Sequence, residues 1–113
     1  MIIMHGLKNC GTCRKALKWL ADESRVHRFH DLRTDGLDAA MIDRWSSAIG
    51  WQILLNRHGT TWRKLSDLET ADLTDARAMN LMMDHPALIK RPIFETSDGR
   101  IIVGFKSADQ VVL

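Results

Sequence analysis

The strongest structural signal in the chain is MIIMHGLKNCGTCRKALKWLADESRVHRFH, residues 1–30. Residues 1–4 are apolar, and residues 2–5 predict a short buried strand. Residues 26–30 alternate in the manner of a second strand. Between them, residues 12–22 carry apolar side chains at the spacing of one helix face. That face consists of Ala16, Leu17, Leu20 and Ala21. A strand, a helix and a strand in this order normally form a parallel pair with a right-handed crossover.

A pair of cysteines stands where the first strand gives way to the helix. The segment Cys10-Gly11-Thr12-Cys13 contains both cysteines of the chain. The first turn of a helix has unpaired N–H groups and a partial positive charge, so a thiolate there is stabilised. We therefore expect Cys10 to be a reactive thiol, although a free cysteine can also be an inert buried residue.

Cys13 has three possible roles. It can be the resolving thiol that attacks an adduct on Cys10, since one helical turn separates the two, or a spectator while glutathione does the resolving. A tetrahedral zinc site would need two more ligands, and only His5 is near in sequence. We therefore favour the resolving role and expect no metal.

The middle of the chain is predicted to be helical. The expected boundaries are a helix that starts at Asp38 and is broken by Gly50, a short helix over residues 51–55, a loop over residues 56–61, and a helix that starts at Thr74 or Asp75 and ends before Pro86.

The last part of the chain returns to strands. Residues 92–96 and 100–103 flank Ser97-Asp98-Gly99, which predicts an antiparallel hairpin. Ser107 or Asp109 is expected to begin a final short helix or tail. The predicted order is therefore β-α-β, helices, β-β-α.

Size and composition bound the possible functions. A chain of 113 residues fits one domain, residues 1–113, and a net charge of +2 gives no strong indication of nucleic-acid binding. No run is long enough to span a membrane and no stretch resembles a signal peptide. Two cysteines so close together suit a catalytic pair in a reducing compartment. We expect a cytoplasmic monomer with no membrane partner.

The chain resembles the ArsC/Spx family, and most closely its YffB-like branch of thiol reductases related to arsenate reductase. The matching segments span nearly the whole chain: Gly6-Leu7-Lys8-Asn9-Cys10, Phe29-His30-Asp31, Asp35-Gly36-Leu37, Gly50-Trp51, Leu54-Leu55-Asn56-Arg57, Gly59-Thr60-Thr61-Trp62-Arg63-Lys64-Leu65, Ile89-Lys90-Arg91-Pro92 and Val103-Gly104-Phe105. The thiol segment is similar to the Spx regulators, whereas residues 59–65, the longer and rarer match, are similar to YffB.

The resemblance implies an α/β, thioredoxin-like fold with a mixed four-stranded sheet and a helical insertion at about residues 35–88. It implies that Cys10 is the reactive thiol, that Arg91 helps hold an oxyanion, and that Pro92 is a cis-proline beside the thiol. Asn56 and Gly104 stand where arsenate reductases carry arginines, which argues against arsenate reduction.

Six residues are candidates for substrate binding. Arginine offers a fork of donors that matches carboxylate or phosphate oxygens, so Arg91 is the leading one. The alternative for each is an ordinary loop or surface role. The candidates are Lys8, Asn9, Asn56, Arg57, Arg91 and Pro92.

Three hypotheses for function follow. The leading one is a thiol-disulfide oxidoreductase, with no tightly bound cofactor and with glutathione, which the resemblance implies, as co-substrate. The second is a redox-sensing regulator like Spx, whose partner is RNA polymerase. The third is an arsenate reductase.

Overall fold

The computed structural model describes residues 1–106, 110 and 113. The chain divides into two compact units, Met1–Gly36 with Arg91–Leu113, and Leu37–Lys90. Each unit is described by itself.

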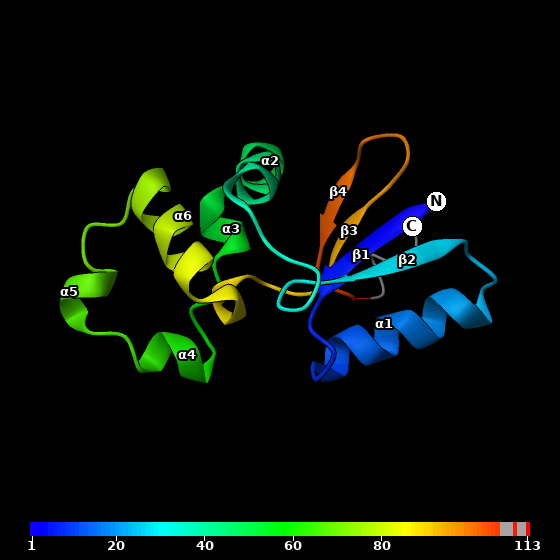
Figure 1. Cartoon of the computed structure of the whole chain (residues 1–113), viewed down its shortest axis with the longest axis horizontal. Helices are drawn as coiled ribbons and strands as arrows, with labels where there is room; N and C mark the ends of the chain where they lie inside the picture. Colours follow the sequence, from blue (N-terminus) through cyan, green and yellow to red (C-terminus); the bar gives the residue numbers. More distant parts are fainter. Residues whose placement is uncertain (107–109, 111–112) are drawn as a thin grey trace. The chain divides into compact units, whose positions relative to one another are not determined.

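The first unit begins with the predicted strand, helix and strand (Figure 1). Strand β1 spans Ile2–Gly6, helix α1 spans Gly11–Asp22, and strand β2 spans His27–Asp31. The strands β1 and β2 are parallel, with Ile2 opposite His27 and Gly6 opposite Asp31. The helix that connects them is the crossover that this topology requires.

The hairpin at the end of the chain completes the sheet. Strand β3 spans Ile93–Glu95 and strand β4 spans Ile101–Val103, and the two are antiparallel as predicted. β3 also pairs antiparallel with β1, with His5 opposite Ile93. The strand order is β2-β1-β3-β4, which is a mixed four-stranded sheet. The predicted helix at Ser107 or Asp109 lies outside the described residues.

The core of this unit lies between the sheet and α1. Buried side chains of β1 and β3 pack against buried side chains of the helix: Ile2, Met4, Cys13, Ala16, Leu20 and Phe94. The predicted helix face was correct at Ala16 and Leu20 and wrong at Ala21, which is exposed. Cys13 takes the core position one turn before Ala16, so the face begins earlier than predicted.

The second unit is helical. Its elements are α2 (Ala39–Ile49), α3 (Trp51–Leu54), α4 (Thr60–Arg63), α5 (Asp67–Thr70), α6 (Asp75–Asp84) and the 3-10 helix η1 (Pro86–Leu88). Asp38 caps α2 by accepting from the Met41 N–H, and Gly50 ends that helix with a positive φ of 88°. Thr74, one of the two predicted residues, caps α6 by accepting from the Arg77 N–H.

Two short helices differ from the prediction. Thr60 and Thr61 were assigned to a loop, but they begin α4 after Gly59. Helix α5 was missed, and it starts with a capping box in which Ser66 and Glu69 exchange hydrogen bonds. The sequences of these helices, TTWR and DLET, contain one apolar side chain each, which is too few to give a periodic signal.

Candidate functional site

Cys10 lies at the N-terminus of α1, as predicted, and a short turn fixes its place. The turn leaves β1 at Gly6 and closes when the Cys10 N–H donates to the Leu7 carbonyl at 3.2 Å. The Cys10 carbonyl then accepts from the Arg14 N–H at 3.0 Å, which is the first hydrogen bond of the helix. Cys10 is therefore the N-cap residue, half-buried, with its sulfur at the positive end of a helix of 12 residues.

The surroundings of Cys10 favour its thiolate. Burial acts against ionisation, but the backbone N–H and thiol of Cys13 and the guanidinium of Arg91 outweigh it, so the pKa of the Cys10 thiol lies below its ordinary value. The thiolate is therefore stabilised by the combined effect of a nearby thiol, an amide dipole and a cation.

The surroundings of Cys13 favour the protonated thiol instead. It is 1% exposed and packs in the core against the sheet. Burial raises the pKa of its thiol to about 12, and the hydrogen bond and charge of Cys10 push in the same direction. Cys13 therefore keeps its proton at neutral pH and acts as a donor to the Cys10 sulfur.

Arg91 and Pro92 come to the thiol from the far end of the sequence. The Arg91–Pro92 peptide bond is cis, as the resemblance implied, and the Pro92 carbonyl accepts from the Gly104 N–H at 2.8 Å. Strand β3 starts one residue later, in register with β1. The sheet register thus places Arg91 at the end of β1 from which the Cys10 turn departs, where its side chain hydrogen bonds to Cys10.

Lys8 and Asn9 lie in the turn before Cys10, and both are exposed. The backbone of Lys8 is held on both sides. Its N–H donates to Asp31 Oδ2 at 3.0 Å, and its carbonyl accepts from Arg14 Nε at 3.2 Å. The structure therefore gives the Lys8 backbone a role in shaping the turn, and it leaves substrate binding by either side chain a prediction.

Asn56 and Arg57 belong to the second unit. The Asn56 side chain accepts from the His58 N–H at 3.0 Å. The Arg57 guanidinium lies over two indole rings, 5.7 Å from the centroid of Trp51 and 5.9 Å from that of Trp62. Both candidates help to order their own loop, and substrate binding by either side chain stays a prediction.

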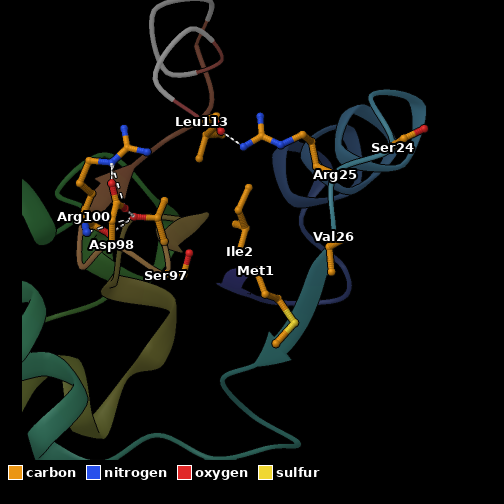
Figure 2. Close-up of a pocket in the computed structure, with 10 residues that line it drawn as sticks. Met1, Ile2, Ser24, Arg25, Val26, Ser97, Asp98, Arg100 and Leu113 are labelled. Carbon is orange, nitrogen blue, oxygen red and sulfur yellow. Dashed lines mark hydrogen bonds and ion pairs between the residues drawn. The ribbon is translucent and has the colours of Figure 1, made fainter.

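A cavity of about 560 Å³ lies in the first unit, and Met1 and Ile2, at the start of β1, are among its lining residues (Figure 2). The thiol turn follows the other end of that strand, at Gly6. The walls of the cavity come from the start of β1, the connection between α1 and β2, the hairpin of β3 and β4, and Leu113. Both of its guanidinium groups have partners, because Arg25 donates to the Leu113 carbonyl and Arg100 pairs with Asp98 at 3.0 Å. This cavity therefore offers no unpaired guanidinium to an anionic ligand.

Two residues that shape the site were missed by the sequence analysis. A Cβ atom built on Gly6 would lie 2.5 Å from Cys13 Sγ, so only glycine leaves room for that sulfur. Asp31 is 3% exposed and holds the Lys8 N–H. Each lies in a segment that carries the family resemblance, which is the one sequence signal that marks it. The burial of Asp31 and the contacts of both residues depend on the folded sheet and are not visible in a sequence.

The described residues give no further site of a familiar kind. Among residues 1–106, 110 and 113, no three His, Cys, Asp or Glu side chains are grouped so that they could hold a metal ion. None of the helices in that part of the chain is both long enough and apolar enough to cross a membrane.

Comparison with known proteins agrees with this fold. A structure of a protein named YffB is 41% identical, with a TM-score of 0.93 over 99% of this chain and 97% of that one. A solution structure of an arsenate reductase (ArsC) related protein from Brucella melitensis is also 41% identical, with a TM-score of 0.80 over 98% and 92% of the two chains. The mixed sheet with its helices is therefore the thioredoxin-like fold that the resemblance implied.

The sequence comparisons extend to regulators. The global transcriptional regulator Spx from Streptococcus mutans is 26% identical over 107 residues, which cover 93% of this chain and 77% of the relative. The profile of the ArsC family matches residues 5–111, which include the thiol segment, Arg91 and Pro92. This chain therefore belongs to the ArsC family.

Proposed function

We propose that this protein is a thiol-disulfide oxidoreductase in which the Cys10 thiolate is the nucleophile and glutathione the co-substrate. The observation that carries the proposal is the placement of Cys10 at the start of α1, with the Cys13 thiol and the Arg91 guanidinium both stabilising its anion. A thiolate is the reactive form of cysteine, so a lowered pKa makes the nucleophile available near neutral pH.

The first step consumes a disulfide. The Cys10 thiolate attacks one sulfur, the S–S bond of the substrate breaks, and the second sulfur leaves as a thiolate that takes a proton from solvent. The product is a mixed disulfide on Cys10. Glutathione carries carboxylates, and the guanidinium of Arg91 offers paired donors of the kind that bind them.

The second step depends on Cys13. The charge and hydrogen bond of Cys10 both raise the pKa of Cys13, and both effects vanish once Cys10 is a neutral mixed disulfide. Cys13 then loses its proton more readily, attacks Cys10 Sγ to form a Cys10–Cys13 disulfide, and the bound thiol leaves as a thiolate that takes a proton. Two glutathione molecules reduce the Cys10–Cys13 disulfide to the two thiols and leave as oxidised glutathione. In the alternative route a glutathione thiolate attacks the mixed disulfide, and Cys13 serves only as a hydrogen-bond donor.

The test of the proposal is a glutathione adduct on Cys10. Purified protein is incubated with oxidised glutathione, and the modified cysteine is located by mass spectrometry of its peptides. We expect the adduct on Cys10, and we expect Cys10→Ser to form none and to lose disulfide reduction. If the Cys10→Ser protein still turned over, Cys10 would not be the nucleophile.

The matched variant at the second cysteine separates the two routes. If Cys13 resolves the adduct, the Cys13→Ser protein accumulates the Cys10 mixed disulfide and turns over slowly. If glutathione resolves it, the same variant retains turnover, and only its thiol reactivity changes.

A second candidate is a redox-sensing regulator. The similarity to Spx and the presence of a cysteine pair favour it, because two thiols one helical turn apart can form a reversible disulfide. Stable co-purification with RNA polymerase, together with absence of turnover with glutathione, is the result that would favour this function over the first.

A third candidate is arsenate reduction, favoured by the family and by the arsenate reductase-related structure. Arsenate reductases carry arginines at three positions to which this chain was compared. This chain has Arg91 at one of them, and Asn56 and Gly104 at the other two. Each lost donor costs on the order of ~3 kcal/mol of stabilisation for a charged adduct. Arsenate-dependent oxidation of a thiol donor would support this candidate.

A further inference from the structure

A buried carboxylate lies next to the thiol turn. Asp31 ends β2 opposite Gly6, the last residue of β1, and is 3% exposed. A buried carboxylate has to be matched by hydrogen bonds or by a cation. The donors that satisfy Asp31 therefore show what this residue does.

The two oxygens of Asp31 have different partners. Oδ1 accepts from the N–H groups of Arg33 at 2.8 Å and Thr34 at 3.1 Å, which closes the turn after β2. Oδ2 accepts from the Lys8 N–H at 3.0 Å, which belongs to the turn that carries Cys10. One carboxylate thus links two loops at the same edge of the sheet.

The Lys8 N–H is one end of a peptide unit whose other end faces Cys10. That unit consists of the Leu7 carbonyl and the Lys8 N–H. The Leu7 carbonyl accepts from the Cys10 N–H at 3.2 Å, while the Lys8 N–H donates to Asp31. Since a peptide unit is planar, fixing its N–H also fixes the direction of its carbonyl.

We propose that Asp31 is a positioning residue for the reactive thiol, acting through the peptide unit of Leu7 and Lys8. It holds this unit so that the Leu7 carbonyl receives the Cys10 N–H and the Cys10 sulfur stays at the first turn of α1. The inference rests on the proposed role of Cys10 as the nucleophile, and it adds a residue that touches neither the sulfur nor the substrate.

The substitution Asp31→Asn isolates this link. An asparagine keeps one oxygen, which can still accept from the Arg33 and Thr34 N–H groups, but it places an NH₂ group opposite the Lys8 N–H. Two donors then face each other, so the turn after β2 is retained while the tie to the thiol turn is lost.

The readout is the rate of Cys10 alkylation as a function of pH, with the labelled cysteine identified by peptide mass spectrometry. For Asp31→Asn we expect a rate about fivefold lower at pH values below the midpoint of the profile, the factor that corresponds to one hydrogen bond. The midpoint of the profile should move to higher pH, while the rate at high pH, where every thiol is ionised, stays unchanged. A purely structural role would lower the melting temperature and leave the profile in place.

Asp35 provides the matched control. Asp35 Oδ2 accepts from the Asp31 N–H at 2.9 Å, so Asp35→Asn perturbs the same turn with the same change of charge but leaves the bond to Lys8 intact. We expect its alkylation profile to overlay that of the unsubstituted protein. An Asp31→Asn profile that also overlays it, or equal shifts for the two variants, would overturn the proposal.

Should Asp31→Asn fail to fold, amide hydrogen exchange of the unsubstituted protein tests the bond between the Lys8 N–H and Asp31 instead. The Lys8 N–H should be protected relative to the N–H of its exposed neighbour Asn9, and its protection should fall as Asp31 is protonated. Equal, fast exchange at both positions would overturn the proposal. Neither experiment uses a disulfide substrate, so absence of a glutathione adduct would count against the proposed function and leave this inference standing.

Discussion

Replacement of Arg91 tests how much of the reactivity of Cys10 comes from a neighbouring cation. The guanidinium lowers the pKa of the thiol in two ways, by a hydrogen bond to the sulfur and by its charge. Arg91→Gln removes the charge and keeps a polar side chain of moderate length. The thiolate then loses one of its stabilising contacts, while those from Cys13 remain.

The size of the effect follows from the exposure of the site. A hydrogen bond to a charged group contributes ~1.5–3 kcal/mol, but Cys10 is half-buried, and solvent screening reduces this to about 1 kcal/mol. Since one pKa unit corresponds to 1.36 kcal/mol, the ratio of thiolate to thiol should fall roughly fivefold.

The assay is alkylation of Cys10 between mildly acidic and strongly alkaline pH. We expect Arg91→Gln to react about fivefold more slowly at pH values below the midpoint of the profile and at the same rate at high pH, where the thiol is fully ionised. Arg91→Lys keeps the charge but lacks the planar guanidinium, so its rate should lie between that of the unsubstituted protein and that of Arg91→Gln.

Arg28→Gln is the control for net charge, because Arg28 is exposed on β2. It should leave the alkylation profile unchanged. A specific effect of Arg91 on the thiolate is excluded if Arg91→Gln reacts as fast as the unsubstituted protein below the midpoint of the profile, or if Arg28→Gln slows the reaction equally. The first result would leave Cys13 and the helix dipole as the sole sources of thiolate stability.

Three further predictions concern stability. Gly6→Ala should lower the free energy of unfolding by about 1–3 kcal/mol in denaturant titrations, because the new methyl group meets Cys13 Sγ at 2.5 Å. Gly11→Ala, where nothing lies within 4 Å, should not be destabilising. Burial raises the pKa of Asp31, but hydrogen bonds from three backbone N–H groups outweigh this and lower it. Its contribution is therefore present above the unfolded pKa of about 4 and lost as pH falls below it. The difference in unfolding free energy between the unsubstituted protein and Asp31→Asn should accordingly shrink below about pH 4 in acid titrations, and a difference that stays constant would contradict this. Leu20→Ala, at a fully buried position, should cost about 2–5 kcal/mol by the same denaturant method, and a loss under ~1 kcal/mol would show that the core closes over the gap.

Much of the first unit could be predicted because its signals are local. The apolar strand, the face of α1 and the cysteine at the helix start all lie within residues 1–30. Helix periodicity, strand alternation and the electrostatics of a helix N-terminus act between residues close in the chain, so a sequence displays them directly. The hairpin of β3 and β4 is predictable for the same reason, since Asp98-Gly99 marks its turn.

Helix α5 in the second unit could not be predicted in this way. Helix α5 is four residues long and is defined by reciprocal hydrogen bonds between Ser66 and Glu69 rather than by an apolar stripe. Such a pattern recurs by chance in loops, and it becomes a helix only where the rest of the unit holds the chain in place.

The amino-acid sequence by itself determined which sulfur is the nucleophile candidate, because the identity and helix position of Cys10 are properties of one continuous segment. Only the tertiary structure decided what surrounds that sulfur. The antiparallel register of β1 and β3 brings Arg91 to the thiol, and the parallel register of β1 and β2 brings Asp31 to the thiol turn. The physical reason is that the pKa of a thiol depends on charges and dipoles within a few ångströms, and those neighbours are chosen by strand pairing and burial rather than by distance along the chain.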